Sequence, residues 1–319
     1  MKSFKLKFLV LVVASLSIYS CRNDDDHRNA QVIVDFGTAP ASSMITTGTV
    51  NVITENEVRY HTINFGEAPY TVTLVETENN IVLVDLGPAP AFAAELKNYY
   101  DAIDKPGAVI ITHNHGDHYG GAGSFTDLDF FAESVVANQL NNTDEFTTLY
   151  SQDVIAVSAT QKIGDLNFNF DKVSNAETGE NGYVYNEEHQ VLFAGDLVYN
   201  LTHPYIREYT PKDAEDEIDN WVAGLTTLKT EFSTYTYLFV GHNGSRSDLV
   251  TAIDENINYL QTAKGLIKGT QTLTAGGTAS TNQEVIDELE LLYPNYKEGG
   301  LSLALPNAFF PGDTGADWF

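Results

Sequence analysis

The sequence has little cysteine, little positive charge and no long apolar run beyond its first twenty residues. Cys21 is the only cysteine, so a disulfide within the chain is excluded. Lys and Arg number 17 against 44 Asp and Glu, and the net charge of -27 repels phosphate backbones. We therefore expect no nucleic-acid partner. No stretch after residue 20 is apolar enough to span a bilayer.

What is present suits a globular protein. The 319 residues fit one large domain or two small ones, and an apolar content of 43% is enough for a sizeable core. The charged fraction of 19% is too low for a disordered acidic chain. We find no internal repeat and no low-complexity segment.

The first twenty residues have the layout of a secretory signal. Three lysines among the first seven residues precede an apolar run over 8–18, and Ser20 then precedes Cys21. This layout resembles a bacterial lipoprotein signal, in which Cys21 becomes the acylated N-terminus once residues 1–20 are removed. The alternative is a plain signal peptide whose cysteine lies near the cleavage point by chance.

Residues 21–50 are expected to form the acylated N-terminus and a linker. The acidic run Asp24-Asp25-Asp26 follows Cys21. It is either a solvated part of a flexible tether or a surface-export tag, since it resembles such tags in some Gram-negative bacteria. We expect the protein to be exported and to be held on a bacterial membrane, the outer membrane, by its acyl chains alone. The oligomeric state is not indicated.

Residues 51–319 alternate between two hydrophobic periods. Strand-like segments lie at 72–76, 81–84, 109–111, 153–173, 182–196 and 237–240. Apolar residues at helical spacing lie at 92–103, 218–228, 249–260 and 285–289. This order predicts an α/β fold with two sheets packed together, helices outside them and further helices towards the C-terminus.

The strongest chemical signal is the segment 112–121, Thr-His-Asn-His-Gly-Asp-His-Tyr-Gly-Gly. It holds three of the eight histidines, His113, His115 and His118, together with Asp117. Imidazole and carboxylate are good ligands for zinc and similar divalent ions. On a tight glycine-containing loop after a strand, four such groups can converge.

Three polar residues elsewhere repeat one geometry. Asp85 follows the apolar run 81–84, Asp196 follows Phe193-Ala194-Gly195, and His242 follows Val240-Gly241. Each is a weak signal alone. Together they place polar groups at the ends of several strands, where they can reach a common centre.

These motifs, in this order and spacing, resemble the metallo-β-lactamase-fold metallo-hydrolase superfamily over about residues 55–245. The resemblance implies a four-layer αβ/βα sandwich for a catalytic domain over 51–319, with extra C-terminal helices and a two-metal site at one edge. It implies that His113 and His115 hold metal one, and that Asp117, His118 and His242 hold metal two. It further implies that Asp196 bridges the metals and that Asp85 orients the histidine loop from behind.

One departure from the family is evident. The family usually has a histidine, often in Gly-His-Thr, about twenty residues before the Gly-Asp. Here Glu177 precedes Thr178 at that point, and we expect it to replace the histidine as the third ligand of metal one, as a Glu does in alkyl-sulfatase relatives. Glu180 or Asn175 as the ligand, or a weak or missing metal one, are the alternatives.

The ligand set bears on the metals. A Glu adds a third carboxylate to the site, which lowers its net positive charge and shifts its preference towards manganese or iron. Two Zn²⁺ ions remain the first expectation because the other ligands are mostly imidazole.

The reaction expected is hydrolysis of a small substrate by a metal-bridging hydroxide, steadied by Asp117. An ester, lactone, amide, sulfate ester or phosphate ester would fit. No Gly-x-Ser-x-Gly stretch suggests a serine nucleophile. His203 is a candidate proton donor to the leaving group, and Arg207 a candidate for binding an anionic part of the substrate. The alternatives are a di-iron redox protein of the same fold and a surface-anchored binding protein with a degenerate metal site.

Overall fold

The computed structural model describes residues 34–55, 57–88, 90–206 and 214–297. The proposed signal segment, Cys21 and Arg207 lie outside these residues. Within them, no helix combines the length and the apolar character that crossing a membrane requires.

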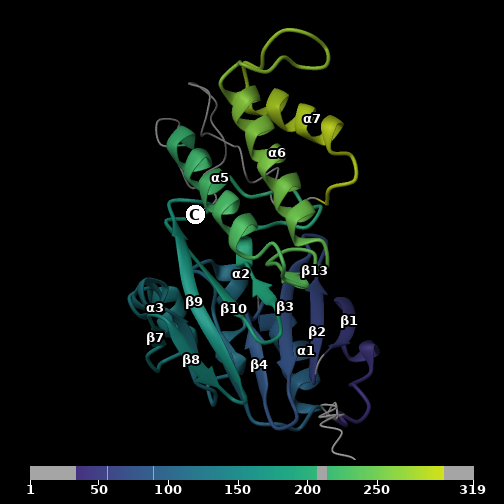
Figure 1. Cartoon of the computed structure of the whole chain (residues 1–319), viewed down its shortest axis with the longest axis vertical. Coiled ribbons are helices and arrows are strands. Elements are labelled where there is room, and N and C mark those ends of the chain that lie inside the picture. The colour runs from purple at the N-terminus through teal and green to yellow at the C-terminus, as the bar shows by residue number, and fades with distance from the viewer. Residues whose placement is uncertain (1–33, 56, 89, 207–213, 298–319) are drawn as a thin grey trace, which may run out of the picture. The chain divides into compact units, whose positions relative to one another are not determined.

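Seven strands form the first sheet, in the order β1-β2-β3-β4-β5-β6-β7 (Figure 1). Their bounds are β1 Gly48–Glu55, β2 Val58–Phe65, β3 Tyr70–Glu76, β4 Ile81–Val84, β5 Gly107–Ile110, β6 Phe130–Glu133 and β7 Ile155–Val157. The strands from β1 to β4 pair antiparallel, and those from β4 to β7 pair parallel.

Six strands form the second sheet, in the order β13-β12-β11-β10-β9-β8. Their bounds are β8 Thr160–Ile163, β9 Leu166–Ser174, β10 Glu180–Asn186, β11 Val191–Phe193, β12 Tyr237–Phe239 and β13 Ser245–Arg246. All pairs are antiparallel except β11 and β12, which run parallel.

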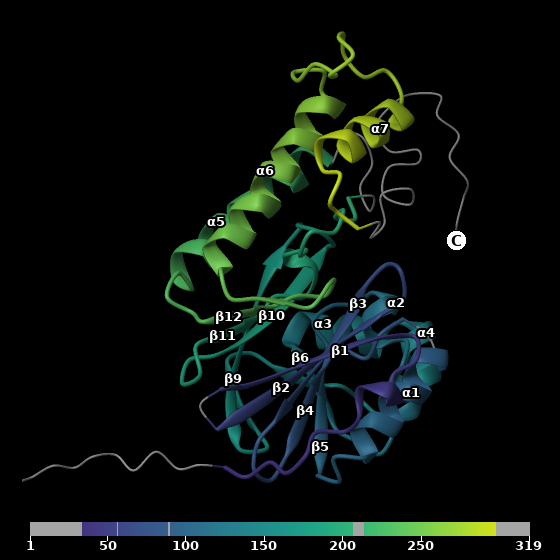
Figure 2. The same cartoon turned by 90° about the vertical axis from the view of Figure 1, so that its right-hand side faces the viewer.

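The longer helices form the outer layers, and short helical turns lie between strands (Figure 2). They are η1 Ser42–Met44, α1 Pro90–Asp101, α2 Gly116–Tyr119, η2 Ala122–Ser124, α3 Ser134–Asn141, α4 Asp144–Leu149, η3 Gly195–Leu197, α5 Ala214–Glu231, α6 Leu249–Ile267 and α7 Asn282–Leu292. Side chains of α1, α3 and α4 share a core with the first sheet, and those of α5, α6 and α7 share one with the second. The expected αβ/βα sandwich with C-terminal helices is thus confirmed.

Three apolar cores hold the four layers together. The strand β4 shows how the sequence divides between them: Ile81 and Leu83 face the outer core under α1, while Val82 and Val84 face the core between the two sheets. Because both faces of such a strand are buried, its sequence is a continuous apolar run instead of an alternating one.

The two sheets meet at the edge where β4, β5, β11 and β12 end. The amide of Thr71 at the start of β3 donates to the carbonyl of Gly241 (2.7 Å). The amide of Gly182 on β10 donates to the carbonyl of Thr112 (2.9 Å). The polar residues that follow these strands are therefore brought together from both sheets.

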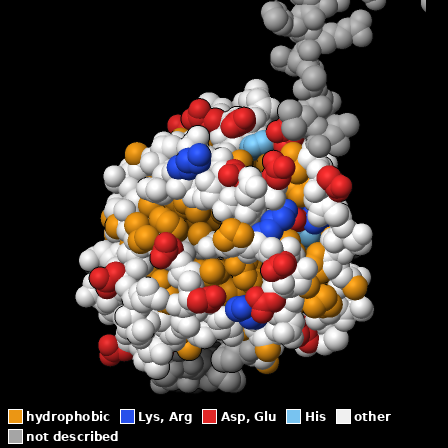
Figure 3. All heavy atoms as spheres, turned by 90° about the horizontal axis from the view of Figure 1, so that it is seen from below, with side chains coloured by type: hydrophobic (Ala, Val, Ile, Leu, Met, Phe, Trp, Pro, Cys, Tyr) orange, Lys and Arg blue, Asp and Glu red, His pale blue; other side chains and the backbone are white. Residues whose placement is uncertain are grey.

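Part of the segment expected as linker packs on the domain. Ile45 is buried in the core of the first sheet, and the guanidinium of Arg59 donates to the carbonyls of Phe36 and Gly37. Acidic side chains are scattered over the face seen from below with few Lys or Arg among them, as the net charge of -27 leads one to expect (Figure 3).

Candidate metal centre

The histidine loop leaves the end of β5 and turns at once into the single helical turn α2. The amide of His118 donates to the carbonyl of His115 (3.0 Å), which closes the turn and brings both imidazoles towards the same edge. The side chains of His113 and His118 are buried, while that of His115 is 19% exposed. The loop therefore presents its ligand-type groups to the interior with one side open.

Asp85 holds this loop from behind. It has a left-handed backbone (φ 62°), and its carboxylate accepts from the amide of Thr112 (2.9 Å), from the Thr112 hydroxyl (2.9 Å) and from Nδ1 of His118 (2.8 Å). When the imidazole is neutral, a proton on Nδ1 held by Asp85 leaves Nε2 as the lone-pair donor that faces the centre of the site.

Two glycines allow Asp196 and His242 to approach the loop. A Cβ on Gly241 would lie 1.9 Å from Oδ1 of Asp196, and a Cβ on Gly195 would lie 2.8 Å from the Thr112 hydroxyl. Gly195 also has a left-handed φ of 52°. The Gly-Asp and Gly-His pairs at the ends of β11 and β12 are thus required by close packing.

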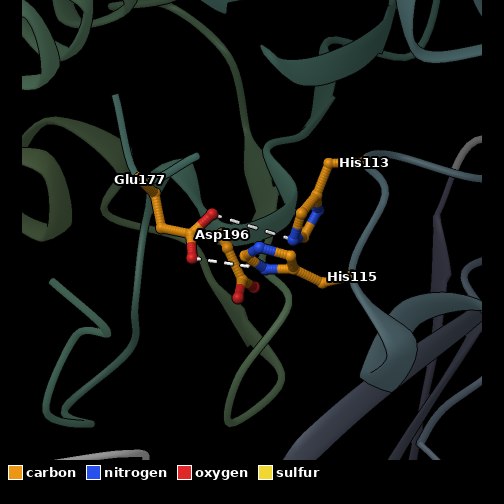
Figure 4. A group of neighbouring side chains, drawn as sticks. All are labelled: His113, His115, Glu177 and Asp196. Carbon is orange, nitrogen blue, oxygen red and sulfur yellow. Dashed lines mark ion pairs between the residues drawn. The ribbon is translucent and has the colours of Figure 1, made fainter. Parts of the chain in front are cut away.

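The first group of ligand-type residues contains His113, His115, Glu177 and Asp196, whose ligand atoms all lie within 4.8 Å of one another. Oε2 of Glu177 is 3.7 Å from Nε2 of His113, and Oε1 is 3.4 Å from Nδ1 of His115. Figure 4 shows the Glu177 carboxylate pointing at both imidazoles, with Asp196 beside them.

Glu177 lies in the turn between β9 and β10, and its surroundings differ from those of the two alternative ligands, Glu180 and Asn175. Its side chain is fully buried, and Oε2 accepts from the amide group of Asn181 (2.8 Å). Glu180 instead pairs with Lys172, and Asn175 is an exposed turn residue with a φ of 49°. Of the three candidates, the geometry brings Glu177 to the histidines.

The second group contains Asp117, His118, Asp196 and His242, again within 4.8 Å of one another. Nε2 of His242 is 3.4 Å from Oδ2 of Asp117 and 3.2 Å from Oδ2 of Asp196. Nε2 of His118 is 3.3 Å from Oδ1 of Asp196. Asp196 is therefore common to both groups and offers one oxygen to each of two imidazoles in the second.

These distances fit metal coordination better than hydrogen bonding. Two ligands of a tetrahedral zinc ion, each about 2.0–2.2 Å from it, lie roughly 3.4 Å apart. Within the described residues, Nε2 of His113, Nε2 of His118 and Oδ1 of Asp196 are buried and make no hydrogen bond. Buried polar atoms that make no hydrogen bond are costly even where an oppositely charged group is near, and their convergence fits cations that the donor set can hold.

The charge distribution without metal follows from the same contacts. Burial alone raises the pKa of Asp117 and of Asp196, but the neighbouring imidazoles outweigh it and hold both pKa values below their usual range. Burial lowers the pKa of His242, yet Asp196 and Asp117 outweigh this effect and raise it to about 9. Bound cations would displace the protons of these imidazoles, so affinity for metal should fall as the pH falls.

This charge distribution predicts that the metal-free protein loses stability at high pH. Since the pKa of His242 rises from 6.5 to about 9 on folding, its contribution is complete below pH 6.5 and is lost as the pH rises to about 9. The contribution of His242 to the loss should be about 3 kcal/mol, and His118, whose pKa is raised against the effect of burial by Asp196 and Asp85, contributes in the same direction. His113, whose pKa burial lowers, stays neutral across this range. Thermal unfolding of chelator-treated protein at pH 6.5 and 9.5 should show this decrease in stability. The decrease should be smaller in the His242→Gln variant, and an equal decrease in variant and wild type would contradict the prediction.

His203, one of the two proposed substrate residues, does not lie among the ligand-type residues. His203 is buried, its Nδ1 is 2.9 Å from the hydroxyl of Tyr259 and its ring packs on Tyr296. The two groups of ligand-type residues found among the described residues do not include it. Two residues further on, the ring of Tyr205 meets His115 edge-on at 6.0 Å, so this segment does pass beside the site.

Sequence reasoning missed Tyr199. Its hydroxyl donates to Oδ2 of Asp196 (2.7 Å), and its ring stacks on His242. Burial and then the Asp196 carboxylate raise the pKa of this phenol well above its ordinary value. In the sequence Tyr199 ends the apolar run Leu197-Val198-Tyr199, which reads as ordinary core.

The fold agrees with known proteins. Residues 66–152 match the family model described as the metallo-beta-lactamase superfamily. A metallo-beta-lactamase from Pontibacter korlensis is 18% identical, with a TM-score of 0.52 over 67% of this chain and 99% of that one. The chain has the metallo-beta-lactamase fold. DIM-1 metallo-beta-lactamase exposed to ceftazidime (15% identity, TM-score 0.53, 67% and 97% coverage) and TMB-1 (14%, 0.51, 67% and 98%) are also similar.

No curated protein matches the chain in sequence. The segment matched by the family model includes Asp85 and the histidine loop, whereas Glu177, Asp196 and His242 lie beyond it. At these identities the likeness to solved metallo-beta-lactamases concerns the fold alone.

Proposed function

We propose that this chain is a metal-dependent hydrolase of a small substrate with an ester, lactone, amide, sulfate ester or phosphate ester bond. The observation that carries the proposal is the sharing of Asp196 by two buried groups of ligand-type residues. A carboxylate between two sets of imidazoles is well placed to be shared by a pair of neighbouring divalent ions.

Each group supplies one cation site in this proposal. His113, His115 and Glu177 hold one cation, Asp117, His118 and His242 hold the other, and Asp196 lies between them. Zinc is the first choice, with manganese or iron as the alternatives. When bound, the pair supplies Lewis acidity and generates the attacking nucleophile from water near neutral pH.

The chain's own residues orient and move protons around this centre. The side chain of Asp117 is 26% exposed, so its carboxylate can accept a hydrogen bond from an incoming water. Asp85 fixes the tautomer of His118. We keep His203 as the candidate proton donor to the leaving group and Arg207 as the candidate anion-binding residue.

Two alternatives compete with hydrolysis. A degenerate site in a binding protein would lack a third ligand for the first cation, but the buried carboxylate of Glu177 stands at that point. A di-iron redox protein would also suit a carboxylate-rich site, and metal content together with redox titration distinguishes it from a hydrolase.

The test is a substrate panel on metal-loaded protein, with metal content measured on the same sample. We expect close to two ions per chain and turnover of at least one ester, lactone, amide, sulfate ester or phosphate ester, abolished by chelation and restored by added metal. Two ions with no turnover across the panel but a reversible redox couple would favour the di-iron alternative. Few or no ions would favour the binding protein.

We also propose that the protein is exported and anchored through acylated Cys21. Cys21→Ser should release it from the membrane fraction, because Cys21 is the only cysteine of the sequence and its acyl chains are the proposed anchor. The measurement is the distribution of the protein between membrane and soluble fractions in a Gram-negative host, with Ser20→Ala as the matched control. Retention of Cys21→Ser in the membrane fraction would contradict lipid anchoring.

A further inference from the structure

Tyr199 lies directly behind the carboxylate that both ligand groups share. Its hydroxyl donates to Oδ2 of Asp196 at 2.7 Å, and its ring stacks on that of His242 with a centroid separation of 4.9 Å and an interplanar angle of 9°. The residue is 3% exposed. One side chain therefore restrains two ligand-type residues of the second group.

Helix α6 holds the backbone of Tyr199 through Asn256. The Tyr199 amide donates to Oδ1 of Asn256 (2.9 Å), while Nδ2 of Asn256 donates to the carbonyls of Tyr199 and Ala252 (both 2.8 Å). Asn256 is 3% exposed and lies in the middle of a helix, where asparagine has low propensity and a buried amide is costly unless its hydrogen bonds are made. Here two of the three hydrogen bonds of the Asn256 side chain are made to the backbone of Tyr199.

Helix α5 restrains the same segment from a second direction. The indole Nε1 of Trp221 donates to the carbonyl of Leu197 (2.9 Å), and its ring packs on that of Tyr199 at 6.3 Å. The segment 197–199 is thus fixed at both backbone and side chain by two helices of the second outer layer.

We propose that Tyr199 is a positioning residue of the metal centre and that Asn256 couples helix α6 to it. The proposal rests on the proposed function. The Asp196 carboxylate must present Oδ1 towards His118 and Oδ2 towards His242 at the same time. A carboxylate oxygen has a second lone pair for the phenol, so the hydrogen bond fixes the orientation of the carboxylate without occupying its ligand position.

Cobalt(II) binding tests this role without a substrate. The Tyr199→Phe variant keeps the ring on His242 and removes only the hydroxyl. We expect its cobalt affinity to fall about 10- to 100-fold at one of two sites, the magnitude typical when a partner of a metal ligand is removed. The visible absorption of the bound cobalt should change as well, because it reports ligand geometry.

Tyr183→Phe is the matched control. The hydroxyl of Tyr183 also donates to an aspartate, Oδ2 of Asp171, at 3.2 Å, and the residue is 4% exposed in the core beside α5. The Tyr183→Phe substitution removes the same kind of hydrogen bond at a place outside the ligand groups. The cobalt affinity and spectrum of this variant should therefore match those of the wild type. Thermal unfolding of each metal-free variant separates loss of fold from loss of metal.

Two further variants divide the role between its parts. Tyr199→Leu removes the stacked ring as well as the hydroxyl, and we expect it to weaken cobalt binding more than Tyr199→Phe. Asn256→Ala leaves the hydroxyl in place but frees the backbone that carries it, and should change the cobalt spectrum in the same direction as Tyr199→Phe.

The outcomes separate this inference from the function on which it rests. Wild-type protein that binds no cobalt would contradict both the positioning role of Tyr199 and the proposed metal-dependent function. Wild-type protein with two cobalt ions, together with a Tyr199→Phe variant of unchanged affinity and spectrum, would overturn the positioning role alone. Equal weakening in Tyr199→Phe and Tyr183→Phe would also overturn it, because the effect would then reflect general destabilisation.

Discussion

Replacing Asp196 with alanine is expected to abolish metal binding and hydrolysis together. Both ligand groups contain this carboxylate, so its removal takes a ligand from each cation and leaves His118 and His242 facing each other without it. A cation pair supplies several kcal/mol of charge stabilisation in the transition state, which corresponds to about 1000-fold in rate or more. Metal analysis and the rate on any substrate found in the panel measure the two effects.

The control for Asp196→Ala is Asp171→Ala. Asp171 is also an aspartate that accepts from a tyrosine hydroxyl, but it is exposed on β9 and belongs to neither ligand group. It should keep two ions and the wild-type rate. An Asp196→Ala variant that retained both ions would show that the shared carboxylate does not hold the centre.

Replacing Glu177 with alanine is expected to remove one cation and leave the other. The first group then keeps His113, His115 and Asp196, while every member of the second group is intact. Metal content should fall from about two ions to about one per chain, and the rate should fall by about 100-fold or more because one of the two Lewis acids is lost. Metal analysis before and after dialysis, paired with kinetics, checks both.

Glu180→Ala and Glu177→His complete the test of that ligand. Glu180 pairs with Lys172 and belongs to neither ligand group, so its loss should change neither metal content nor rate. Glu177→His should restore two ions and favour zinc over manganese, because imidazole is the softer ligand. A Glu177→Ala variant with full metal, or a Glu180→Ala variant that loses one ion, would refute the assignment.

The sheets were predictable where both faces of a strand are buried. The run Ile81 to Val84 is apolar throughout because it lies between two cores, and such a run indicates a buried strand without any knowledge of its partners. The strand β6 and the helices α3 and α4, over residues 130–149, were not predicted. There the strand β6 is only four residues long and passes directly into α3, with Glu133 capping the helix through Val135 N (2.7 Å). No turn signal separates the two.

The candidate site was predictable to the extent that its chemistry is local. The spacing of four ligand-type residues within one loop indicates a metal site from the sequence alone. The structure places these residues, His113, His115, Asp117 and His118, in the two ligand groups. Tyr199 and Asn181 could not be found in this way. Each acts through a contact with a ligand-type residue, Asp196 or Glu177, and such contacts depend on rotamers and on helix packing that no spacing encodes.

The most direct test of the two-cation centre is a crystal structure of the metal-loaded protein, with diffraction measured on both sides of the absorption edge of the metal. Two anomalous peaks about 3.5–4 Å apart are expected, one beside His113, His115 and Glu177 and the other beside Asp117, His118 and His242, with Asp196 between them. An absence of peaks at this edge of the sandwich, or a single peak that Glu177 and His113 do not contact, would contradict it.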